Sequence, residues 1–202
     1  MRASVAQKTV QVTAHASVTA YGLSQVQVTD IGPSHGAQSE TVKLTGVGTG
    51  TETTRYVNGV VYFKANAIFL EIEFNITNSK YANKRISVKK GQKDYTEISE
   101  GMYTSSISGQ LSPVGTLSKA TVTYKGHSAI EITGNASATQ GIGKGKVHLY
   151  VSTQTPYLPL GESVATVVQG ENFTGSVTLS NWKLAVTALE PASSTPINQT
   201  NL

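Results

Sequence analysis

The stretch Arg55-Tyr56-Val57-Asn58-Gly59-Val60-Val61-Tyr62-Phe63 is the clearest structural signal in this chain. Its Asn-Gly pair lies between two β-rich runs and favours a type I′ hairpin, because both turn residues need positive φ. Lys125-Gly126, between residues 119–124 and 127–133, predicts a second hairpin. The fold is therefore expected to be based on antiparallel strands.

Further runs on both sides of these hairpins also predict strands. They alternate apolar and polar residues or are bounded by turn residues, as strands typically are. These runs are residues 25–29, 41–45, 86–88, 147–152, 157–167 and 175–180. The glycine-rich stretches 46–50 and 141–145 lack Rossmann or P-loop spacing, so we interpret them as turns.

The N-terminal stretch supports two readings. Val10, Ala14, Val18 and Tyr21 form a stripe at helical spacing, whereas residues 9–13 alternate like a strand. We favour a helix over about residues 3–21, with Gly22 as its C-terminal cap.

The middle of the chain differs from its flanks. Residues 67–74 and 94–111 carry apolar side chains at spacings that predict short amphipathic helices. This order of strands, helical insertion and strands predicts an α+β fold with one large antiparallel sheet. We expect a single domain over residues 1–191 and an exposed coil over 192–202. A sheet of that size twists and curls, so helices on its concave face would cover either a core or a ligand cavity.

Composition excludes several kinds of site. The chain has 202 residues, none of them cysteine, which excludes disulfides, thiolate zinc sites, iron–sulfur clusters and cysteine nucleophiles. Only 14% of residues are charged, with a net charge of +4. No run of about 18 apolar residues is present, so no membrane-spanning helix is predicted. The start at Met1 shows no signal peptide, which suits either a cytoplasmic protein or a trimmed mature domain.

The basic charge does not indicate nucleic-acid binding. The positive residues are scattered apart from one cluster, and no RNA-binding or helix-turn-helix signature accompanies them. That cluster is Lys84, Arg85, Lys89, Lys90 and Lys93. We interpret it as a solvated basic face, and an anionic envelope surface would suit the same charge.

Catalytic and metal-binding patterns are weak. His15, His35, His127 and His148 have no metal-ligand spacing, and no Gly-x-Ser-x-Gly motif is present. Neither an enzyme, a metal site nor a cofactor is therefore expected.

Two other features each have two readings. Glu71 and Glu73 could form an acid–base pair, but solvated positions or salt bridges explain them better. Trp182 is either a core residue near a strand end or part of a ligand-pocket mouth.

An ordered set of motifs resembles the bacterial LppX/LprG-type lipoproteins, which have the LolA/LolB-like carrier fold. The C-terminal part carries most of them, and shorter matches precede it in the same order. The matching segments are residues 147–152, 156–160, 175–182 and 185–191, preceded by 25–29, 58–64 and 84–88. The sequence departs from the family pattern at Leu158 and at residues 181–186, and it lacks the family's signal peptide and lipobox cysteine.

The resemblance implies a curved antiparallel half-barrel with helices over its concave side and an apolar cavity for acyl chains. It also implies a non-catalytic lipid-binding domain of the bacterial cell envelope. The partners would be a lipid or acylated ligand, and the membrane through an N-terminal lipid anchor outside this chain. We expect a secreted or membrane-anchored monomer. The expected cavity lining is Tyr62, Ile68, Phe69, Ile72, Phe74, Tyr103, Ile107, Leu111, Leu149 and Val151.

Two rival functions remain open. One is a structural or interaction module of the envelope with the same fold and a filled core. A cavity of tens of Å³ would favour that module, and one of several hundred would favour a lipid carrier. The other is a small hydrolase, which would need a Ser or Glu within hydrogen-bond reach of a histidine at a cleft.

Overall fold

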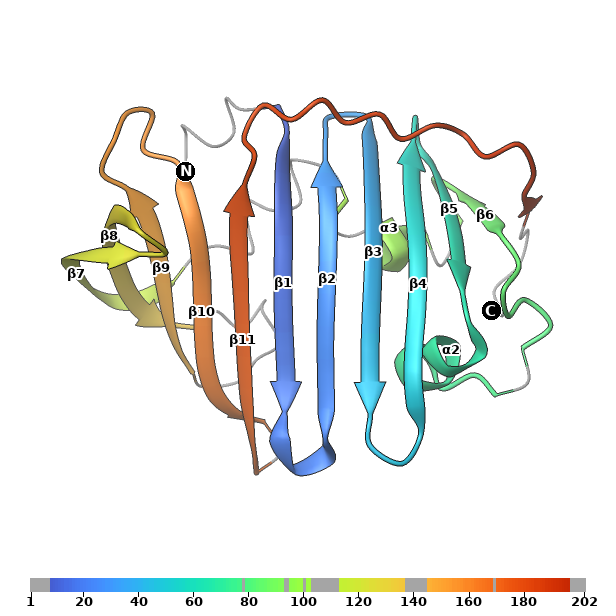
Figure 1. The fold of residues 1–202 in the computed structure, drawn as a ribbon, viewed down its shortest axis with the longest axis horizontal. Coiled ribbons are helices and arrows are strands. Elements are labelled where there is room, and N and C mark those ends of the chain that lie inside the picture. Colours follow the sequence, from blue (N-terminus) through green and yellow to red (C-terminus); the bar gives the residue numbers. More distant parts are fainter. Residues whose placement is uncertain are drawn as a thin grey trace.

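The computed structural model describes residues 8–77, 79–92, 95–99, 101–102, 113–136, 145–168 and 170–196. In these ranges, twelve strands form one sheet in the order β12-β6-β5-β4-β3-β2-β1-β11-β10-β9-β8-β7 (Figure 1). The strands are β1 Val10–Val18, β2 Leu23–Ile31, β3 His35–Leu44, β4 Gly48–Val57, β5 Val60–Ala65, β6 Ile86–Lys89, β7 Val114–Tyr124, β8 His127–Asn135, β9 Lys146–Ser152, β10 Pro159–Val168, β11 Glu171–Ser180 and β12 Thr195–Pro196.

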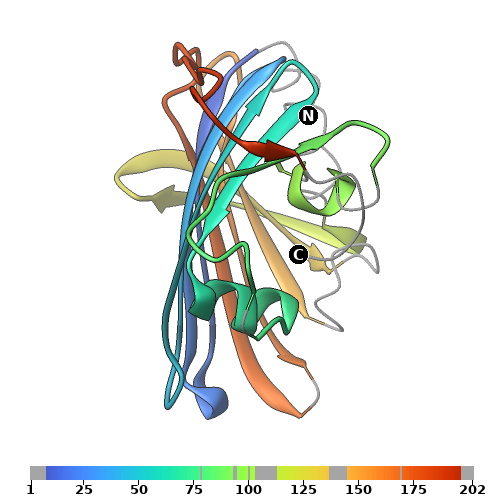
Figure 2. The same cartoon turned by 90° about the vertical axis from the view of Figure 1, so that its right-hand side faces the viewer.

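The sheet is curved and open, and its helices lie on the concave side (Figure 2). These helices are α2, Ala67–Phe74, and α3, Tyr95–Ser99. Neighbouring strands pair antiparallel, except that β12 runs parallel to β6. The predicted α+β fold with one large curved sheet is therefore confirmed. In the described ranges, neither helix has the length and hydropathy that a membrane crossing requires.

The predicted helix over residues 3–21 is wrong. The described part of this stretch is the strand β1, followed by one turn of 3-10 helix, η1, at Thr19–Tyr21. β1 pairs with β2 on one side and β11 on the other, so both of its edges are satisfied by backbone hydrogen bonds. The hydrogen bonds to two neighbouring strands therefore decide the conformation of this stretch, although its apolar residues also have helical spacing. Gly22 ends the 3-10 turn with φ +57°, as its predicted capping role requires.

Both predicted hairpins are present. Asn58 and Gly59 have φ of 47° and 85° and connect β4 to β5. Lys125 and Gly126 have φ of 48° and 82° and connect β7 to β8. Positive φ at both central residues is the type I′ geometry that matches the twist of the flanking strands.

The helix predicted at residues 67–74 is confirmed as α2. Asn66 caps its start by accepting a 2.8 Å hydrogen bond from the Phe69 backbone N–H. Asn75 ends it in the left-handed region, with φ 54°. Of the second predicted helix, residues 95–99 are helical as α3, and much of its remainder lies outside the described residues.

Cross-strand register shows which side chains share the concave face. Directly opposed residues point to the same side of a sheet. One such row runs across seven strands of the sheet. It contains Leu179, Val12, Thr29, Gln38, Thr54, Phe63 and Ile86. The next residues along each strand point to the convex face.

The concave face carries two separate apolar clusters. The first lies beneath α2 and α3 and includes Val42, Phe63, Phe69 and Ile86. The second lies on the other half of the sheet and includes Val10, Ile31, Leu149 and Leu179, with Trp182 packed against it. The core-residue interpretation of Trp182 agrees with this position. Each half of the sheet therefore buries apolar side chains on the same, concave face.

The C-terminal segment crosses the strand ends from β11 towards β6 (Figure 1). Ala188 packs with Val57 and Tyr62, and the Tyr62 hydroxyl donates a 2.6 Å hydrogen bond to Glu190. Residues 195–196, expected as coil, are exposed but pair with β6 as β12. Residues 197–202 lie outside the described ranges.

Helix α2 rests directly on a glycine of the sheet. A Cβ added to Gly50 would lie 2.6 Å from the Phe69 Cα and 2.8 Å from its backbone nitrogen. We predict that Gly50→Ala displaces α2 and lowers the free energy of unfolding by about 1–3 kcal/mol, as overpacking does. Chemical denaturation measures this. Thr51→Ala, at the exposed neighbouring position, is the control. Equal stability of the two variants would contradict the close packing.

Candidate functional site

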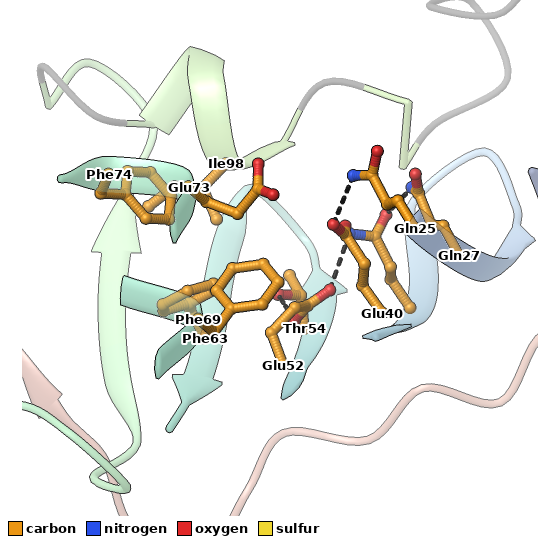
Figure 3. Close-up of a pocket in the computed structure, with 11 residues that line it drawn as sticks. Gln25, Gln27, Glu40, Glu52, Thr54, Phe63, Phe69, Glu73, Phe74 and Ile98 are labelled. Atoms are coloured by element: carbon orange, nitrogen blue, oxygen red, sulfur yellow. Dashed lines mark hydrogen bonds between the residues drawn. The ribbon is translucent and has the colours of Figure 1, made fainter. Parts of the chain in front are cut away.

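A pocket of about 240 Å³ opens on the concave face between the sheet and the helices (Figure 3). Strands β2 to β5 form its floor, and α2 and α3 contribute its outer wall. Its lining combines apolar and polar side chains. They are Gln25, Gln27, Gln38, Glu40, Glu52, Thr54, Phe63, Phe69, Glu73, Phe74 and Ile98.

One wall of the pocket is aromatic. Phe63 from β5 contacts Phe69 and Phe74 from α2, with ring centroids 6.1 and 6.0 Å apart. Phe69 and Phe74 are 6.3 Å apart. These tilted and edge-on arrangements are favourable for aromatic rings. We call Phe63, Phe69 and Phe74 the phenylalanine cluster.

The opposite wall is polar and comes from the middle of the sheet. We call it the polar strip: Gln25, Gln27, Gln38, Glu40, Glu52 and Thr54. Register explains it, because Gln27 lies opposite Glu40, Glu40 opposite Glu52, and Gln38 opposite Thr54. The polar strip separates the phenylalanine cluster from the second apolar cluster.

Hydrogen bonds connect the members of the polar strip. Gln25 donates to Glu40 at 2.5 Å, and Gln38 donates to Glu52 at 2.8 Å. Thr54 donates to the other Glu52 oxygen at 2.7 Å. Gln27 donates to the Gln38 carbonyl oxygen at 2.5 Å. The amides and the hydroxyl therefore hold both carboxyl groups in fixed positions.

Glu40 and Glu52 are an unusual pair for a sheet. They are directly opposed and only 8% and 3% exposed. Like charges in such positions destabilise a sheet. Burial raises the pKa of Glu52 to about 7, although its hydrogen bonds to Thr54 and Gln38 favour the ionised form, and Glu40 raises it further. Burial likewise raises the pKa of Glu40, against the hydrogen bond from Gln25.

A third carboxyl group reaches the pocket from α2. Glu73 is exposed at the pocket rim, on the helix side of the cavity (Figure 3). Partial desolvation raises its pKa, and the charge of Glu40 adds to the effect. Sequence reasoning treated Glu73 as a solvated or salt-bridged residue. Its exposure fits that reading, but it also lines the pocket.

The structure separates the ten predicted lining residues into four groups. Phe69 and Phe74 line the pocket. Ile72 packs against the cluster beneath α2, and Ile68 lies near Gly48. Leu149 and Val151 belong to the second apolar cluster on the concave face. The remaining four residues are Tyr62, Tyr103, Ile107 and Leu111.

Tyr62 was placed on the wrong face. It follows the register of the convex side, where it packs with Val57 and Ala188, and its neighbour Phe63 takes the pocket position. A one-residue error of phase moves a strand side chain to the opposite face. Tyr103, Ile107 and Leu111 lie outside the described residues.

The polar strip was missed from the sequence. Gln25 and Gln27 alternate with Val26 and Val28, which suggests valines inside and glutamines in solvent. The structure has the opposite phase: Gln25 and Gln27 face the pocket, and the valines face the convex side. Only the pairing with β1 and β3 fixes this phase.

Two histidines have side-chain partners of the kind that the hydrolase alternative requires. The Nδ1 atom of His148 is 3.0 Å from Glu131 and 3.2 Å from the Thr133 hydroxyl. His35 Nδ1 is 2.9 Å from the Ser34 hydroxyl. None of the histidines is among the residues lining the pocket. Among the described residues, no three His, Asp or Glu side chains are placed to hold a metal ion.

The pKa of Glu52 predicts how stability varies with pH. The unfolded carboxyl ionises near 4.5 and the folded one near 7. Between these values the folded state retains a proton that the unfolded chain has lost, so stability falls as pH rises and then levels off. The shift corresponds to up to about 3 kcal/mol.

We predict that Glu52→Gln removes this loss and leaves the protein more stable than the wild type at pH 8, with little difference at pH 4. Urea denaturation across this pH range measures it. Glu162, whose pKa burial also raises to about 7, is present in both proteins, so the difference isolates Glu52. The exposed Glu71→Gln is the control, and an unchanged pH profile in Glu52→Gln would overturn the assignment.

Comparison with known proteins identifies the fold. The sequence matches no known family model and no curated protein. Among solved structures, the fold matches the crystal structure of the Mycobacterium tuberculosis lipoprotein LppX. The TM-score is 0.55 at 14% identity, over 93% of this chain and 92% of that chain. The predicted likeness to LppX-type lipoproteins is thus confirmed for the fold: this chain has the curved, open sheet of LppX.

Proposed function

We propose that the concave face binds the acyl chain of a lipid or an acylated ligand, without catalysis. The observation that carries the proposal is the pocket, which lies on the concave face of an LppX-like sheet and has an aromatic wall. Acyl chains bind through burial of apolar surface, at roughly 0.8 kcal/mol per CH₂ group. Such a ligand needs an apolar surface rather than a catalytic motif.

The second apolar cluster supports the same proposal. Several of its members are only half-buried, although they face the concave side: Val12, Ile132, Val151, Val177 and Trp182. Half-buried apolar residues gathered on one concave face still have surface to bury against a ligand. A chain could contact both the phenylalanine cluster and this second cluster by passing the polar strip.

Cavity size favours a ligand site over a filled structural module. The pocket volume of about 240 Å³ is well above the tens of Å³ expected for a filled core. It lies slightly below the roughly 300–1,000 Å³ of typical small-molecule sites. A pocket of this size is suited to one portion of an amphiphile.

The place of action is part of the proposal. LppX is a lipoprotein, and a lipid-binding domain of the bacterial cell envelope, anchored or secreted, is the function that best joins this fold to a pocket with an aromatic wall. A small hydrolase is less well supported, because the histidine contacts lie away from the pocket lining.

Lipid binding can be tested on protein purified from bacteria. We expect native mass spectrometry and organic extraction to detect a co-purified amphiphile, or a fluorescent fatty acid to bind with saturation. Protein that carries no lipid and binds no acylated probe would refute the proposal.

A matched pair of variants tests the concave face. Val12 points to the concave side and Thr13 to the convex side of β1. We predict that Val12→Asp weakens acyl-probe binding at least tenfold, because a carboxylate on the apolar face must be desolvated. Thr13→Asp places the same charge one residue away and should bind normally. Equal binding by the two folded variants would place the ligand elsewhere.

A further inference from the structure

The charge of the pocket is opposite to that of the chain. The protein carries a net charge of +4, yet among the described residues the pocket lining contains three carboxyl groups and no Lys, Arg or His. Glu40 and Glu52 come from the sheet, and Glu73 comes from α2. Any ligand headgroup in this pocket therefore meets acidic side chains from two sides.

The hydrogen bonds of the polar strip do not require two buried carboxyl groups. Glutamine at position 40 could accept the hydrogen bond from Gln25, and glutamine at position 52 could accept from Gln38 while its NH₂ group donates to the Thr54 hydroxyl. Neither replacement would bury a charge. Instead, two carboxyl groups face each other across β3 and β4. Violations of a local rule of this kind tend to occur at functional sites.

The aromatic wall adds an independent feature. The phenylalanine cluster borders the same cavity as the three carboxyl groups (Figure 3). Faces of aromatic rings attract cations, and quaternary ammonium groups are recognised in this way. The carboxyl groups are distributed around the cavity and do not converge on one point as metal ligands would. An organic cation with attached carbon groups matches both the acidic and the aromatic surfaces.

We propose that this pocket selects amphiphiles with a cationic, ammonium-type headgroup, which sits between Glu40, Glu52 and Glu73 while the adjoining carbons contact the phenylalanine cluster. This inference rests on the proposed binding of amphiphiles by the concave face. The ammonium supplies a positive charge opposite these three carboxyl groups. An anionic headgroup meets three carboxyl groups and is rejected.

The test compares three amphiphiles with the same dodecyl chain, below their micelle concentrations and at pH 8. Their headgroups are trimethylammonium, neutral maltoside and sulfate. Calorimetry or displacement of a fluorescent acyl probe gives the affinities. We expect the trimethylammonium compound to bind at least tenfold more tightly than the maltoside, and the sulfate to bind most weakly.

Two variants connect the preference to the pocket. The double variant Glu40→Gln/Glu52→Gln keeps the shape of the polar strip and removes both buried carboxyl groups. It should remove most of the cation preference, measured as the ratio of trimethylammonium affinity to maltoside affinity. Glu73→Gln, at an exposed position of α2, should reduce the preference by about two- to fivefold, in the range of an exposed ion pair. Glu71→Gln, exposed on the same helix but outside the lining, should leave it unchanged.

The outcomes separate this inference from the proposed function. If none of the three amphiphiles binds, acyl binding by the concave face is wrong. If all bind with equal affinity, or if the sulfate binds best, the concave face binds acyl chains but headgroup selection is wrong. If the cation preference persists both in Glu40→Gln/Glu52→Gln and in Glu73→Gln, the cation binds outside this pocket.

Discussion

The pairing of β1 with β11 is the constraint on which the rest of the structure depends. Without this pairing, β1–β6 with β12 and β7–β11 would be two smaller sheets. Eight residue pairs from Gln11–Ser180 to Val18–Phe173 join the beginning of the chain to its end. Such non-local pairing closes a long loop and is entropically costly. The curved surface as a whole therefore forms only when both ends of the chain are in place.

This connection also determines how the concave face is divided. A single sheet has two faces, and in the described part of the chain the helices α2 and α3 cover the concave one. One apolar cluster from each half lies on that face, which gives the sheet its inward side. The polar strip on β2–β4 then lies between two apolar surfaces. The position of the strip follows from strand order and register rather than from any local motif.

Local signals in the sequence predicted local structure well. Asn58-Gly59 located a hairpin, and the apolar residues of 67–74 located a helix. The predictions that were wrong depended on which strands lie alongside, and the sequence does not show this. Residues 10–18 fit both helical and strand periods until β2 and β11 are known. Tyr62 and Phe63 were equally plausible pocket residues, because sequence alone does not decide which of two adjacent apolar residues faces inward.

The polar strip shows why the site was harder to predict than the fold. In a half-buried strand, alternation is usually interpreted as apolar side chains inside and polar ones outside. Gln25 and Gln27 reverse this rule, and the reversal costs stability because their polar groups, and those of Glu40 and Glu52, must be satisfied away from water. The network meets that cost through paired amides and carboxyl groups. A core built for stability alone would have valines on this face, and this reversal is the observation on which the proposed headgroup selection rests.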